Sequence, residues 1–162
     1  MSNVVAGVVR GQMPYLEEHI ARKKAIYERY REGLKDLPVT MNPYVAEIME
    51  PNFWLSCIII DEDAMCLEER TDSGAKYVKV KGKSCPIHIL EELAKYNAEG
   101  RPIWKPMHLQ PIYKDSPFVT RAEGASDVGL DIFLRGICLP SDNKMTIEEQ
   151  DQIIQIIRNC FK

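Results

Sequence analysis

The chain has 162 residues, the size of one domain, with 21 Lys and Arg against 24 Asp and Glu and a net charge of −3. Basic and acidic residues alternate along it, so we expect no cationic surface that would attract nucleic acid. The apolar runs fall far short of the ~20 residues of a membrane span, which argues against a membrane partner. Five cysteines without a C-x-x-C pair favour reduced thiols in a cytoplasmic protein over disulfides or a metal site.

An apolar segment, residues 1–13, opens the chain. Ser2 or Asn3 can cap a helix whose first turns, residues 4–9, carry small and apolar side chains. A segment this apolar must be buried against something, so we expect it to pack on a large domain or on a partner subunit. Pro14 then favours the start of a new helix.

A long amphipathic helix is predicted for residues 15–34. Its apolar side chains recur at three- and four-residue steps, with charged residues mostly between them. Glu17 and Glu18 lie near its amino end, where the helix dipole favours negative charge, and Pro38 marks its end.

Two strands follow, residues 39–41 and 53–60. The second is almost continuously apolar, which predicts a central strand covered on both faces with Trp54 in the core. The carboxylates of residues 61–63 alternate in direction along an extended chain, so they cannot converge on one metal ion.

An alternating pattern predicts a strand at residues 77–81. Residues 82–84, Gly-Lys-Ser, resemble the tail of a phosphate-binding loop, but Tyr77 stands where that motif needs its first glycine, which argues against nucleotide hydrolysis. Ser84 is expected to cap a helix at residues 87–98; the alternative is that the free N–H groups of this helix hold a phosphate.

Residues 101–111, which we call the arm, combine three prolines with polar and aromatic side chains. Each proline fixes its own φ and disfavours a helical residue before it, so the arm is predicted to be stiff and non-helical. It is either a binding site or a structured loop whose Trp and Met cap the core while its Lys and His face water. The side chains that it would present are Trp104, Lys105, His108 and Gln110.

The chain continues through a polar surface loop, residues 114–123, into a short helix. Ser126 and Asp127 are expected to cap this helix, residues 128–134, and Gly136 to close it.

A short strand, residues 137–139, precedes the last helix. Thr146 and Glu149 have the spacing of a capping box, which predicts the start of that helix. The order of elements predicts a single α+β domain over residues 1–162, with a small, mostly antiparallel sheet covered by helices.

The sequence resembles the small C-terminal domain of the DegT/DnrJ/EryC1/StrS family of pyridoxal-phosphate sugar-nucleotide aminotransferases, in particular the branch that aminates 4-keto-6-deoxy UDP-sugars. The arm is the most specific part of this likeness. The matching segments are residues 1–3, 82–86, 97–100, the arm, 112–113 and 135–141.

The resemblance implies the small domain of a type I fold aminotransferase and a homodimer with the active site at its interface. The Schiff-base lysine and the rest of the pyridoxal phosphate site would lie in a large domain preceding Met1, so no catalytic residue is assigned to this chain. Lys105 would place a positive charge near phosphate, His108 would donate a hydrogen bond to the substrate or to the cofactor phosphate, and Trp104 or Tyr113 would form an apolar wall. Gln110 is assigned to the same substrate site, and Asn3 to the neighbouring subunit's cofactor.

Two functional hypotheses follow. The first is a nucleotide-sugar aminotransferase of which this chain is one domain, inactive alone. The second is a stand-alone module that binds an anionic ligand through the arm without catalysis. An unrelated small enzyme has little support, because no nucleophile, base and orienting group occur together in the sequence.

Overall fold

The computed structural model of the chain describes residues 2–71, 74–122 and 124–162. Its helices are α1 (Asn3–Gln12), α2 (Leu16–Leu34), α3 (Pro86–Ala94), α4 (Val128–Arg135) and α5 (Ile147–Asn159). Its strands are β1 (Val39–Met41), β2 (Ser56–Ile60), β3 (Glu68–Thr71), β4 (Gly74–Tyr77), β5 (Arg101–Pro102) and β6 (Gly136–Leu139).

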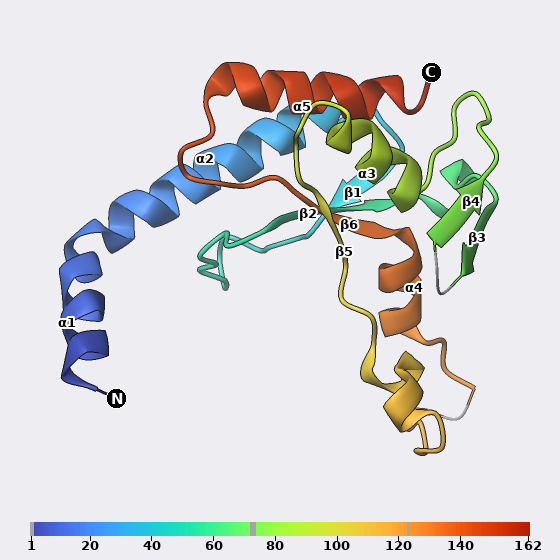
Figure 1. Cartoon of the computed structure of the whole chain (residues 1–162), viewed down its shortest axis with the longest axis horizontal. Coiled ribbons are helices and arrows are strands. Elements are labelled where there is room, and N and C mark those ends of the chain that lie inside the picture. The colour runs from blue at the N-terminus through green and yellow to red at the C-terminus, as the bar shows by residue number, and fades with distance from the viewer. Residues whose placement is uncertain (1, 72–73, 123) are drawn as a thin grey trace.

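The central sheet is antiparallel and has the strand order β1-β2-β6-β5. Strands β3 and β4 pair with each other as a separate antiparallel hairpin. Helices α2, α3 and α5 lie on one side of the central sheet (Figure 1). The predicted α+β fold, with a small antiparallel sheet covered by helices, is therefore confirmed.

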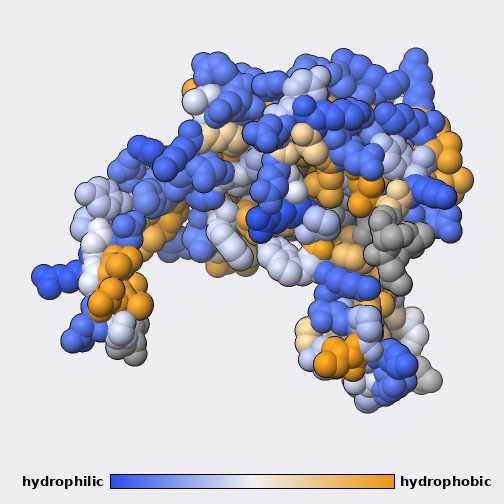
Figure 2. Space-filling view, in the orientation of Figure 1, coloured by the Kyte–Doolittle hydropathy of each residue, from blue (hydrophilic) through white to orange (hydrophobic). Residues whose placement is uncertain are grey.

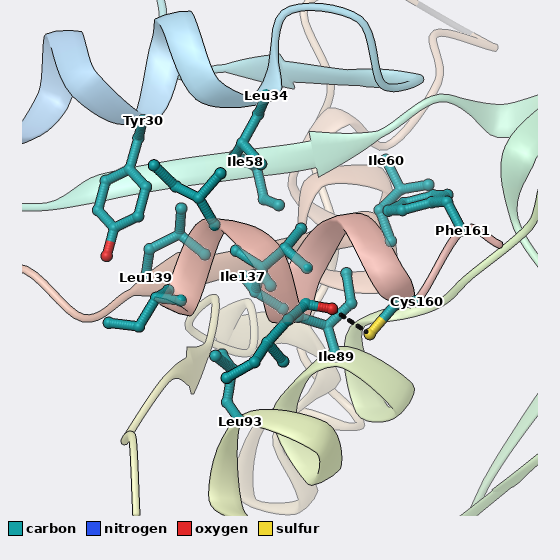
Figure 3. Packing of buried hydrophobic residues seen from close by; sticks show 14 of the residues in the cluster. Tyr30, Leu34, Ile58, Ile60, Ile89, Leu93, Ile137, Leu139, Cys160 and Phe161 are labelled. Carbon is teal, nitrogen blue, oxygen red and sulfur yellow. Dashed lines mark hydrogen bonds between the residues drawn. The ribbon is translucent and has the colours of Figure 1, made fainter. Parts of the chain in front are cut away.

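The core lies between the central sheet and these helices (Figure 3). Ile58, Ile89, Ile137 and Ile157 are completely buried there. Tyr30 is also buried, and its hydroxyl donates to the Pro140 carbonyl over 2.8 Å, which satisfies the one polar atom of its side chain.

Two parts of the chain extend away from this core, on opposite sides of the molecule (Figure 1). One is α1, which has no buried residue. The other comprises the end of the arm and α4. Figure 2 shows hydrophobic side chains gathered on α1, where Val4 and Val8 are 77% and 62% exposed. The predicted apolar first helix is thus present and has no apolar partner in the described chain.

The predicted caps of the first and last helices are confirmed. The Ser2 hydroxyl accepts from the N–H of Val5 at the start of α1. Thr146 and Glu149 form the predicted capping box of α5, each side chain accepting from the other residue's N–H.

The predicted strand 53–60 is wrong at its beginning. Phe53 has a φ of +52°, in the left-handed region, so regular pairing starts only at Ser56. Trp54 is 64% exposed and is not a core residue. Burial alternates along β2, so one of its faces is only half-covered, in contrast to the expected cover on both faces.

The predictions for residues 77–98 need three corrections. The strand ends at Tyr77 instead of beginning there, and α3 stops at Ala94. Ser84 does not cap α3, because its hydroxyl is buried and lies 3.1 Å from Nδ1 of His88.

Within the described ranges no helix is long and apolar enough to cross a membrane. In the same ranges no cluster of His, Cys, Asp and Glu is arranged to hold a metal ion. Two of the acidic residues 61–63 lie in a single 3-10 turn, Glu62–Ala64, and Asp61 precedes it.

Candidate functional site

The arm begins as an edge strand of the central sheet. In β5, Arg101 pairs with Cys138 and Pro102 with Ile137 of β6. Beyond it the chain makes two single 3-10 turns, Met107–Leu109 and Pro111–Tyr113. The arm is thus anchored at its start. The prediction that the arm is non-helical is wrong at these two turns. One turn begins directly after a proline and the other at a proline, and the fixed φ of proline is compatible with a 3-10 turn.

His108 is the most constrained side chain of the arm. Its Nε2 lies 2.5 Å from Oδ2 of Asp127, and the two side chains are only 21% and 20% exposed. The Phe118 ring covers the imidazole, with the ring centroids 4.0 Å apart. The carboxylate and the aromatic ring together fix the orientation of the imidazole and leave Nδ1 as the ring nitrogen available to a ligand.

Asp127 has a second contact, because it is the amino-terminal cap of α4. Its Oδ1 accepts from the N–H of Leu130 over 2.9 Å. Helix α4 is itself tied to the sheet, since Arg135 donates to the Ile60 carbonyl over 2.7 Å. Arg135 also pairs with Asp131 and holds the pKa of that carboxyl below its usual value. One carboxylate therefore links the arm to a helix that is anchored on β2.

Substitutions at Asp127 can separate these two contacts. Serine can still cap α4, but its side chain is too short to reach His108 as well. We expect Asp127→Ala to lower the free energy of unfolding by about 0.5–2 kcal/mol through loss of the cap, and Asp127→Ser to lower it by less. Urea titration measures both values. The ring ¹⁵N shifts of His108 are expected to change in both variants, and unchanged shifts in Asp127→Ser would contradict the contact.

Trp104 lies beside Trp54 on the outside of the domain. The centroids of the two indoles are 6.2 Å apart, and each side chain is 64% exposed. Met107 is exposed as well, whereas His108 is half-buried. Trp104, Met107 and His108 therefore differ from the loop interpretation, in which Trp and Met would cap the core and His would face water. The exposed Lys105 agrees with it.

The other predicted site residues, two in the arm and two outside it, differ in their contacts. The Gln110 side-chain amide donates to the Lys105 carbonyl over 3.4 Å, so it braces the backbone of the arm. The Lys105 side chain is exposed and has no ion pair within the described chain. Tyr113 is 36% exposed. Asn3 is not brought near this group, because it begins α1 on the far side of the molecule (Figure 1).

Three side chains of this region were not identified as site residues from the sequence. Asp127 was predicted only as a helix cap, and Trp54 as a core residue. Phe118 lies in a loop that was interpreted as plain surface. No local pattern pairs His108 with a residue 19 positions later, so only the tertiary structure reveals this contact.

Burial is one of the conditions that activate a Schiff-base lysine, and no lysine in the described ranges is buried. The chemistry available on the arm is instead that of anion recognition, with an exposed ammonium group, an oriented imidazole and an indole wall.

Comparison with curated proteins finds relatives along nearly the whole chain. EpsN of Bacillus subtilis (strain 168), whose name describes a pyridoxal phosphate-dependent aminotransferase, is 33% identical over 163 residues. GDP-perosamine synthase of Vibrio cholerae is 25% identical over 161 residues. Each alignment covers 99% of this chain but only 36% and 38% of the relative. The chain therefore spans little more than a third of the length of these relatives.

Solved structures share the fold. The sugar aminotransferase Spr1654 from Streptococcus pneumoniae, solved in PLP, PMP and apo forms, superposes with a TM-score of 0.74 at 20% identity. The match to its PMP form covers 99% of this chain and 35% of that one. A DegT DnrJ EryC1 StrS aminotransferase from Brucella abortus matches with a TM-score of 0.67 at 22% identity, over 95% of this chain and 34% of that one.

The family assignment rests on the extent of the sequence match. Residues 1–158 match the DegT/DnrJ/EryC1/StrS aminotransferase family, and the arm that carried the resemblance lies within this range. The chain belongs to the DegT/DnrJ/EryC1/StrS aminotransferase family.

Proposed function

We propose that this chain is the C-terminal small domain of a pyridoxal phosphate-dependent aminotransferase that transfers an amino group from an amino acid to a 4-keto-6-deoxy nucleotide sugar. Its role is to bind the nucleotide sugar, and the observation that carries the proposal is the oriented imidazole of His108 on the arm. The match to EpsN along 99% of the chain supports the reaction class.

The proposed role of the arm is to hold the diphosphate of the substrate. Asp127 occupies Nε2 of His108, which leaves Nδ1 for the ligand, and this nitrogen donates to a phosphate oxygen when the imidazole is protonated. The exposed Lys105 adds a second positive charge. Hydrogen bonds between charged donors and phosphate oxygens are among the strongest in proteins. Trp104 offers an exposed apolar surface for the hexose or the base.

The segment around α1 has a different proposed role. Its valines are exposed, and a contiguous apolar patch of this kind usually marks an interface. We assign it to contact with the large, pyridoxal phosphate-binding domain or with the second subunit of a homodimer. That large domain would hold the pyridoxal phosphate. When bound, this cofactor supplies the chemistry that transfers the amino group.

Replacing His108 by alanine in the full-length enzyme tests the proposal. A charge-assisted hydrogen bond contributes about 1.5–3 kcal/mol, so KM for the 4-keto sugar nucleotide is expected to rise by about 10- to 150-fold. Lys114→Ala is the matched control, because Lys114 is an exposed cation just beyond the arm. Unchanged turnover with a lowered melting temperature would show that His108 only supports the fold.

The binding-module hypothesis gives a different result. Under that hypothesis the 162-residue chain alone binds a UDP-sugar through the arm, and His108→Ala abolishes binding without any transaminase activity to lose. Calorimetric titration of the isolated chain with a UDP-sugar, beside the kinetic assay of the full-length enzyme, distinguishes the two.

A further inference from the structure

A second pocket lies on the helical side of the sheet, away from the arm. It has a volume of about 390 Å³, within the range of small-molecule sites, and it is bounded by the turn after β4, by α3 and by the end of α5. In the view of Figure 1, α3 and α5 lie above the central sheet, whereas the end of the arm and α4 lie below it. The two sites therefore do not share a surface.

Positive charge dominates the wall of this pocket. Four lysines line it, Lys79, Lys81, Lys83 and Lys162, and Glu92 is the one side-chain carboxylate among the described lining residues. Glu92 is already neutralised, because Lys79 and Lys95 lie 3.2 and 2.7 Å from its Oε1. The net excess of positive charge is notable in a chain whose overall charge is −3.

Hydrogen bonds fix the backbone of the turn that carries Lys81 and Lys83. The N–H of Lys83 donates to the Val80 carbonyl over 3.0 Å and closes the turn, with Gly82 at a φ of +79°. The N–H of Gly82 donates to the Phe161 carbonyl over 3.1 Å, which ties the turn to the end of α5. Lys81 and Lys83 have no ion pair in the described chain. Their charges therefore remain available to a ligand.

Part of the pocket lining combines Nε2 of His88 with apolar surface. His88 is 8% exposed, and the Ser84 hydroxyl at its Nδ1 fixes the ring. Its Nε2 is 3.7 Å from Glu92 Oε1, too far for a hydrogen bond, so this nitrogen can still pair with a ligand. Burial, with Lys79 nearby, lowers the pKa of His88 and favours the neutral ring. Tyr96 and Ile156 supply the apolar part of the lining.

We propose that this pocket binds a small phosphorylated molecule, with Lys81 and Lys83 on the phosphate oxygens and the ring of Tyr96 against its organic part. Lysine ammonium groups bind phosphate as point charges, and an aromatic wall suits a planar base. The site is separate from the arm, so this inference does not depend on the proposed aminotransferase reaction.

The test is a titration of the chain with inorganic pyrophosphate and with ADP, followed by calorimetry and by ¹H–¹⁵N NMR. We expect shifts at residues 79–83, 88 and 156–162, and tighter binding of ADP than of pyrophosphate if the apolar wall contributes. The double variant Lys81→Gln/Lys83→Gln is expected to weaken binding by about tenfold or more. The control Lys24→Gln/Lys144→Gln removes the same charge from two exposed lysines elsewhere and is expected to bind normally.

Three outcomes would overturn the proposal. The first is the absence of binding of either probe at about 5 mM, which corresponds to an affinity too weak for a site. The second is equal weakening in both double variants, which would indicate only diffuse electrostatic attraction. The third is a set of shifts confined to the arm, near Lys105 and His108, which would place the phosphate in the other site. That last result would leave the proposed function intact, so the two proposals fail separately.

Discussion

Replacing Ile137 by alanine is expected to lower the free energy of unfolding by about 2–5 kcal/mol. Ile137 is completely buried in β6, the strand between β2 and β5, and it lies opposite Ile58 and Pro102. Truncation loses the transfer free energy of three carbon atoms and leaves a cavity that two neighbouring strands cannot close without disturbing their pairing. Because domains of this size are stable by only about 5–15 kcal/mol, the effect is large.

Ile48→Ala is the matched control for this prediction. It removes the same atoms from a side chain that is 81% exposed, so the expected change is within about 0.5 kcal/mol. Urea unfolding of the wild type and both variants provides the comparison. Equal effects of the two substitutions would show that β6 is not at the centre of the core.

The second large effect is expected for Gly136→Ala. A Cβ atom at this position would lie 2.5 Å from the Ile132 carbonyl oxygen and 2.7 Å from Cγ1 of Ile103. The first neighbour is a backbone atom of α4 and cannot rotate away. Overpacking of this kind costs about 1–3 kcal/mol or more, and here it would also push α4 away from β6 and the arm.

Gly129→Ala, inside α4, is expected to give the opposite result. Its nearest new contacts would be at 3.5 Å, which is ordinary van der Waals separation. Alanine in a helix is favoured over glycine by about 0.5–1 kcal/mol, so this variant is expected to be slightly more stable than the wild type. Thermal unfolding of the two variants shows whether each substitution raises or lowers the melting temperature. A destabilised Gly129→Ala and an unchanged Gly136→Ala would contradict the proposed overpacking at Gly136.

Gly136 also illustrates how a correct sequence prediction can have a different physical reason. Glycine after a helix is usually explained by a left-handed φ, and on that ground we expected it to close the helix. In the structure Gly136 does follow α4, but its φ is −100°, which any residue can adopt. The glycine is needed for the close approach of α4 and the arm, and this approach cannot be read from local sequence.

The helices were predicted well because the signals that define them are local. The apolar period of α2 and the capping box of α5 depend on residues three or four positions apart. The hairpin β3–β4 was missed, since residues 68–71 carry charged side chains instead of an apolar pattern. Residues 72–74, Asp-Ser-Gly, have the composition of a turn, and residues 72 and 73 lie outside the described chain.

The candidate site also has a part that the sequence reveals and a part that only the tertiary structure shows. The prolines and side chains of the arm drew attention to Trp104, Lys105 and His108 from the sequence alone, because stiff segments with this composition are rare. The orientation of His108 depends on its contact with Asp127, 19 positions later in the chain. The place of Trp104 beside Trp54 joins two residues that are 50 positions apart. The sequence therefore determined the family, the fold class and the caps of α1, α4 and α5. Only the tertiary structure decided which side chains meet, because contacts between distant segments depend on how the whole core packs.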